Sequence, residues 1–179
     1  LVLGPMLTKY GYAKIALPGG CAIGSRPVNF HLDALKKLGA SISLENGYIE
    51  AKADRLIGAD IVFDGVTVTG TENIMMAACL AKGKTTLRNV AMEPEVSDLA
   101  DFLNLMGAKI KGAGSELIEI EGVEYLNSTT YTIPADRIEA GTYLVAAAAT
   151  GGEIKINSIQ PERLNNVIER LKLSGALIE

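Results

Sequence analysis

A repeat with a period of about 68 residues restricts the fold of this chain more than any other feature. Three similar phrases each place a glycine at the same point: Leu38–Ile42, Met106–Ile110 and Ser174–Ile178, with glycines at 39, 107 and 175. Three prolines recur with nearly the same spacing: Pro27, Pro94 and Pro161. A fixed period indicates one supersecondary unit used more than once, so three copies of one unit are expected.

Between each proline and its glycine the apolar residues follow a helical pattern. The clearest case is Leu164, Val167, Ile168 and Leu171, which lie on one face of a helix. Proline suits the first helical position because its missing N–H would be unpaired there, and glycine suits the position after the helix ends. Each copy is therefore predicted to contain a helix of about three turns.

Short runs rich in β-branched residues flank these helices and predict strands. They are 14–17, 41–44, 48–51, 60–63, 85–87, 117–121, 130–133 and 153–156. A second helix, apolar on every side, is predicted at 73–81 and again at 142–149, and helices of that kind belong in a core. The pattern predicts an α/β (α+β) fold of repeated strand and helix units, with the most apolar helices inside.

One copy departs from the others in the loop that joins its strand to its helix. That loop has nine residues in the first copy, 18–26, against five and four at 89–93 and 157–160. It holds Cys21 directly after two glycines, in a setting that favours a reactive thiol, although a free cysteine is more often a small buried residue. Cys79 lies in an apolar run and is expected to be buried. The 18–26 loop is therefore the leading candidate site.

Arg26 and His31 lie on either side of the helix start that follows this loop. A helix N-terminus beside an arginine favours a phosphate or carboxylate, but a surface arginine paired with a glutamate explains Arg26 equally well. His31 is the single histidine, and it is assigned to ligand binding against a structural or surface role. With no second histidine, neither a metal site nor a Ser-His-Asp triad is expected.

Composition excludes several classes of function. A net charge of −4, without a basic cluster, disfavours nucleic-acid binding. No apolar run approaches the roughly 20 residues that span a bilayer, so a soluble, cytoplasmic protein without membrane partners is expected. The glycine-rich loop lacks the P-loop and dinucleotide-binding patterns, and no cofactor is expected.

The segment Leu17–Val28, followed by His31, closely resembles the catalytic loop of the enolpyruvyl transferases that act on UDP-N-acetylglucosamine. Further matching segments cover nearly the whole chain: 38–40, 64–69, 93–95, 107–110, 120–123 and 136–142. The resemblance implies an inside-out α/β barrel built from three such repeats, and two similar domains with the substrates between them. Residues 1–134 would then belong to the first domain, and 135–179 would open the second.

The resemblance also implies roles for individual residues. Cys21 matches the proton donor, which is also the thiol that fosfomycin alkylates, in an addition–elimination between phosphoenolpyruvate and the sugar 3′-hydroxyl. The residues that match UDP-sugar segments or their neighbours are Arg26, Pro27, Val28, Asn29, Phe30, His31, Gly65, Val66, Thr67, Val68 and Asp136. Family members often carry lysine at the position of Gly65, so a side-chain contact is lost there.

Two parts of the family's site have no counterpart in this sequence: the Lys-Asn pair that binds phosphoenolpyruvate and the carboxylate thought to take the sugar proton. The 179-residue chain alone is therefore predicted to be inactive, and it could pair with a second copy of itself. Two alternatives remain. The first is the sister enzyme that makes enolpyruvylshikimate phosphate, whose loop resembles Gly-Thr-Ala-x-Arg-Pro without a cysteine. The second is a non-catalytic repeat scaffold.

Overall fold

The computed structural model describes residues 1–19 and 28–179, which form two compact units. The first unit spans Leu1–Thr130 and the second Tyr131–Glu179, and each is described by itself. Among the described residues, no helix is long and apolar enough to cross a membrane.

The first sheet of the first unit has three antiparallel strands in the order β1-β3-β2. These are β1 (Tyr12–Ala16), β2 (Ser41–Glu45) and β3 (Tyr48–Lys52). The hairpin between β2 and β3 turns at Asn46 and Gly47, where both residues have positive φ angles of 50° and 78°. A two-residue turn of Asn-Gly with this geometry matches the twist of the two strands and fixes their register.

The second sheet has four strands in the order β4-β5-β7-β6. They are β4 (Asp60–Val62), β5 (Lys84–Arg88), β6 (Lys109–Lys111) and β7 (Leu117–Glu121). β4 runs parallel to β5, and the other two pairs are antiparallel. Alternate residues of β5 and β7 are fully buried, whereas the opposite face is exposed or half-buried and carries most of the charged residues of these strands.

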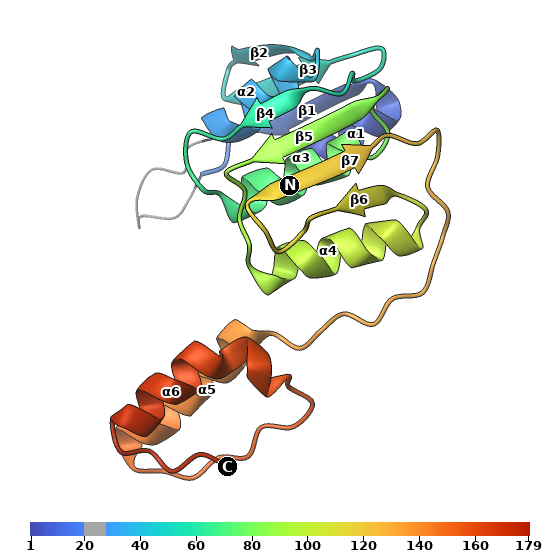
Figure 1. Ribbon diagram of the computed structural model, residues 1–179. Helices are drawn as coiled ribbons and strands as arrows, with labels where there is room; N and C mark the ends of the chain where they lie inside the picture. The colour runs from blue at the N-terminus through green and yellow to red at the C-terminus, as the bar shows by residue number, and fades with distance from the viewer. Residues whose placement is uncertain (20–27) are drawn as a thin grey trace. The chain divides into compact units, whose positions relative to one another are not determined.

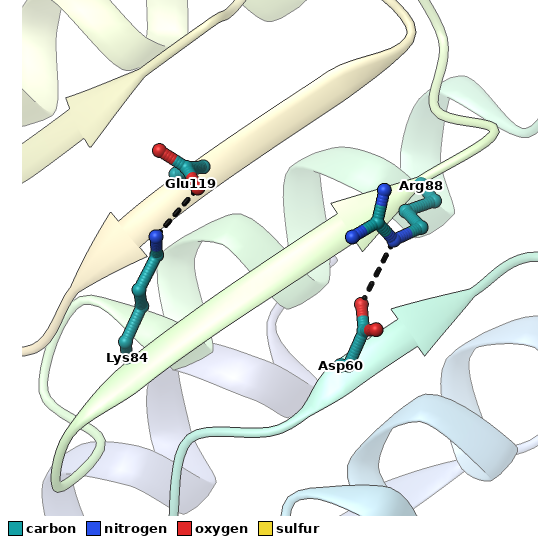
Figure 2. A network of polar contacts seen from close by, with 4 residues as sticks. All are labelled: Asp60, Lys84, Arg88 and Glu119. Carbon is teal, nitrogen blue, oxygen red and sulfur yellow. Dashed lines mark hydrogen bonds and ion pairs between the residues drawn. The ribbon is translucent and has the colours of Figure 1, made fainter.

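Figure 2 shows four residues of this charged face, on neighbouring strands. Lys84 Nζ lies 2.5 Å from Glu119 Oε1, and Arg88 Nε lies 3.1 Å from Asp60 Oδ1. All four side chains are more than 40% exposed, so each pair is screened by water and contributes little to stability. The pairs mark the outward face of the sheet, and the opposite face packs on the core.

The helices of the first unit are α1 (Leu3–Tyr10), α2 (Asn29–Lys37), α3 (Val68–Ala78) and α4 (Pro94–Leu105). Helix α3 is in contact with the other three helices and with β7 (Figure 1). Ile74, Met75, Ala77 and Ala78 have no exposed surface. The prediction that the helix at 73–81 lies inside the core is confirmed, although the helix begins five residues earlier.

Two elements of the first unit were not predicted. Helix α1 was missed because it is short and contains Gly4 and Pro5, but Pro5 falls in the first turn, where a proline is tolerated. Strand β6 has only three residues, two of them lysines, and gives no strand signal of its own. Helix α1 buries Leu3 and Leu7, so packing outweighs its weak local preference.

The second unit holds helix α5 (Arg137–Thr150), a 3₁₀ turn η1 (Pro161–Leu164) and helix α6 (Asn165–Leu173). Gly141 forms the contact between them, since a Cβ at this position would lie 3.4 Å from Leu164 and 4.0 Å from Val167. The helices predicted after Pro161 and around 142–149 are thus confirmed.

Two expectations for the second unit are wrong. The helix expected in the interior, α5, exposes 54% of Tyr143 and 48% of Val145, because α6 and η1 cover only one of its sides. The segments 130–133 and 153–156 are not strands. Strands β1 and β5 each pair with a strand that follows the next helix of the repeat, whereas no described strand lies beside 153–156. A strand without a neighbour is not stable.

Candidate functional site

The start of α2 and the turn that leads into α3 lie against each other in the first unit. Phe30 is the point of contact, because a Cβ added at Gly65 would lie 3.3 Å from Cζ of its ring. Val28 and Phe30 are both half-buried against the core. The structure therefore brings together two of the segments that the sequence assigned to a UDP-sugar, and the glycine leaves room for the phenyl ring.

Thr67 fixes the turn of the second segment, 65–68. It is the N-cap of α3: its backbone is extended, and its side-chain oxygen accepts a hydrogen bond of 3.2 Å from the Gly70 N–H. Its carbonyl accepts a second bond of 2.7 Å from the Thr71 hydroxyl. Val66 is 63% exposed directly before this cap. The segment is thus an ordered turn with free surface at the N-terminal end of a buried helix, where the positive end of the helix dipole favours an anion.

His31 is held by a buried side chain of α3. Its Nδ1 lies 3.1 Å from Nδ2 of Asn73, and Oδ1 of Asn73 accepts a hydrogen bond of 2.8 Å from the Gly4 N–H. Burial lowers the pKa of His31, and the positive charge of the Leu1 amino group lowers it further. Both effects disfavour the charged form of the ring.

Sequence reasoning did not single out Asn73 or Glu72. Burial raises the pKa of the half-buried Glu72 carboxyl, and the negative charges of Glu95 and Glu93 at the start of α4 add to this effect. The available signal was a Glu-Asn pair directly before the apolar run that begins at Ile74. A carboxyl that holds its proton more tightly than usual is a candidate proton donor.

Three of the predicted site residues, Cys21, Arg26 and Pro27, lie outside the described residues. Cys79, the other cysteine, is buried and free, as predicted. Its thiol donates to the Met75 carbonyl oxygen at 3.2 Å, and burial raises its pKa to about 12. A thiol with that pKa is not a nucleophile or an acid near neutral pH.

Asp136 belongs to the second unit, where it is the N-cap of α5. One of its carboxylate oxygens accepts hydrogen bonds from the backbone N–H groups of Ile138 and Glu139, at 2.8 and 3.1 Å. Asp136 also lines a pocket of this unit together with Tyr143 and Lys155.

Within residues 1–19 and 28–179, no group of three or more His, Cys, Asp or Glu side chains could hold a metal ion.

Solved structures of enolpyruvyl transferases have this fold. The enolpyruvyl transferase NikO from Streptomyces tendae matches with a TM-score of 0.69 and 24% identity, over 82% of this chain and 35% of that one. The EPSP synthase of Acinetobacter baumannii matches with the same score and identity, over 97% of this chain and 40% of that one. At this identity the likeness establishes the fold alone, and it confirms the predicted fold class.

The sequence establishes the family. The family model described as EPSP synthase (3-phosphoshikimate 1-carboxyvinyltransferase) matches residues 1–179, so the chain belongs to this family. Curated relatives named UDP-N-acetylglucosamine 1-carboxyvinyltransferase are 59% identical in Desulforapulum autotrophicum, 58% in Solidesulfovibrio magneticus and 57% in Hydrogenovibrio crunogenus. These matches cover 99 to 100% of this chain and 43% of each relative, so the chain spans less than half of their length.

Proposed function

We propose that this chain is part of an enzyme that transfers the enolpyruvyl group of phosphoenolpyruvate to the 3′-hydroxyl of UDP-N-acetylglucosamine and releases phosphate. The observation that carries the proposal is an identity of 57 to 59% along the chain with three relatives of that name. The Pro-Gly-Gly-Cys phrase at 18–21 supports it. The reaction is the first committed step of peptidoglycan synthesis, which takes place in the cytoplasm.

The proposed site residues have two roles, proton donation and binding of the sugar nucleotide. Cys21 delivers a proton to C3 of phosphoenolpyruvate, and the same thiol is the one that fosfomycin alkylates. Arg26 forms charged hydrogen bonds to the diphosphate, as a guanidinium can do with two donors at once. The stretch 27–31 continues the sugar-nucleotide site, and the contact between Phe30 and Gly65 supports its proximity to the 65–68 turn. No cofactor takes part.

The 65–68 turn binds through backbone groups, because Gly65 has no side chain and the exposed Val66 is apolar. Asp136 also takes part in binding the substrate. The first domain takes in residues 1–134, and 135–179 is the opening repeat of the second. A chain of this length holds part of both domains, so we expect it to be inactive alone.

The experiment that tests this function uses the enzyme at the full length of its relatives. Incubation with fosfomycin and UDP-N-acetylglucosamine should add the mass of one fosfomycin at Cys21, detected by peptide mass spectrometry. The Cys21→Asp variant keeps an acidic group but no sulfur, so it should retain activity and gain no mass. Absence of the adduct in the unmodified enzyme would favour a non-catalytic scaffold.

An enzyme acting on shikimate 3-phosphate is the second candidate, because the matching family model is described by that activity. A thermal-shift comparison separates the two. UDP-N-acetylglucosamine should raise the melting temperature and shikimate 3-phosphate should not, and the reverse order would assign the enzyme to the shikimate reaction.

A further inference from the structure

Asn73 is a buried polar side chain at the centre of the first unit, where it joins three helices. It has no exposed surface. It lies on α3, its Oδ1 accepts from the backbone of Gly4 on α1, and its Nδ2 meets His31 on α2. Both polar atoms of the amide are therefore satisfied by partners 69 and 42 residues away in the sequence.

The orientation of this amide follows from its partners. The Gly4 N–H can only donate, so the atom 2.8 Å from it must be the carbonyl oxygen of Asn73. The NH₂ group then faces Nδ1 of His31 at 3.1 Å. An amide NH₂ also only donates, so Nδ1 of His31 must accept and cannot carry a proton. A neutral imidazole without a proton on Nδ1 carries it on Nε2.

The arrangement is rigid as well as specific. A Cβ at Gly4 would collide with the backbone oxygen of Asn73 and would lie 2.7 Å from its Oδ1, so only glycine allows α1 to approach so closely. The imidazolium form of His31 would set an N–H of the ring against the N–H of the amide. Burial acts in the same direction, because it disfavours the charged ring.

We propose that Asn73 is a positioning residue that holds His31 as a neutral ring with its proton on Nε2, so that the ring serves the sugar-nucleotide site as an uncharged hydrogen-bond donor. The ligand in this statement rests on the proposed function, whereas the state of the ring does not. A neutral donor suits an acceptor oxygen of a nucleotide sugar.

The state of the ring can be measured directly. The chain has one histidine, so every imidazole signal in a long-range ¹H–¹⁵N correlation spectrum of the labelled 179-residue protein belongs to His31. At pH 7 we expect an unprotonated Nδ1 and a protonated Nε2. A protonated Nδ1 in the unmodified chain would overturn the proposal, and this result needs no variant.

The Asn73→Asp variant replaces the NH₂ donor that faces His31 Nδ1 by an acceptor oxygen. Its carboxylate still accepts from Gly4 but can no longer donate, so we expect the proton to move to Nδ1 and the pKa of His31 to rise above that of the unmodified chain. Thr8→Ala is the matched control. It removes a hydrogen bond of 2.9 Å from the Thr8 hydroxyl to the Ala77 carbonyl, which also joins α1 to α3 but does not involve His31. An unchanged ring in Asn73→Asp, or an equal change in Thr8→Ala, would contradict the proposal.

Binding measurements on the enzyme at the length of its relatives test the ligand. We expect Asn73→Asp to weaken UDP-N-acetylglucosamine binding by about 2- to 10-fold, the effect of one hydrogen bond, and Thr8→Ala to leave it unchanged. If Asn73→Asp and the unmodified enzyme bind UDP-N-acetylglucosamine equally well, His31 does not contact this ligand. The spectrum would still decide the protonation state of the ring. No binding by the unmodified enzyme would instead refute the proposed function. If Asn73→Asp does not fold, the spectrum of the unmodified chain still decides the state of the ring.

Discussion

Replacing Thr67 by alanine should destabilise the first unit by removing the cap of its central helix. The change removes the hydrogen bond from the Gly70 N–H to the Thr67 hydroxyl oxygen, and Gly70 is buried. It keeps the two bonds that the Thr67 carbonyl accepts, from the backbone N–H and the hydroxyl of Thr71. We therefore expect a loss of about 1 to 2 kcal/mol, the upper part of the range for N-caps.

Urea unfolding provides the measurement, followed through the amide signals of Ile74 and Met75 because both residues are buried in α3. Such signals report on the first unit alone, whereas circular dichroism would add the helices of the second. The control is Thr67→Ser, which keeps the hydroxyl and should stay within about 0.5 kcal/mol of the unmodified chain. Equal losses in the serine and alanine variants would show that the methyl group, and not the cap, stabilises α3.

Three further predictions concern stability and reactivity. Gly122→Ala should cost about 3 kcal/mol or more in urea unfolding, since its Cβ would overlap the Ala81 carbonyl oxygen. Gly19→Ala should cost less than about 0.5 kcal/mol, because no atom of the described residues would lie within 4 Å of its Cβ. Cys79 should react with thiol reagents only as the chain unfolds, because burial raises its pKa to about 12, and rapid labelling of the native chain in mass spectra would contradict this. The lowered pKa of His31 means that the unfolded chain binds more protons just below the ordinary value of about 6.5, so stability should fall as pH drops through that window, and urea unfolding of His31→Gln should show a flatter profile.

The repeat was enough to predict the regular part of the fold. Proline and glycine at fixed spacing predicted α4 and α6, and alternating or β-branched runs predicted every strand of the first unit except β6. The features that the sequence did not predict depend on which other elements pack against a segment. The exposure of α5 depends on what covers it, and the local sequence of α5 is as apolar as a buried helix requires.

Part of the candidate site was likewise predicted from the sequence, and part was found only in the structure. The loop insertion pointed to Cys21 and Arg26 because it is a difference between copies that can be counted in the sequence. The link between His31 and Asn73 joins residues 42 positions apart on two helices, and no local pattern encodes it. The contact between Phe30 and Gly65 likewise arises only when α2 and the 65–68 turn pack together.

The two outer strands of the four-stranded sheet, β4 and β6, are each only three residues long. Lys109 and Lys111 leave β6 with a charged, exposed residue on either side of its buried Ile110. A strand from another molecule that joined this edge would gain few backbone hydrogen bonds and would bring its own side chains against two ammonium groups. The β6 edge of the sheet is thereby protected against edge-to-edge aggregation.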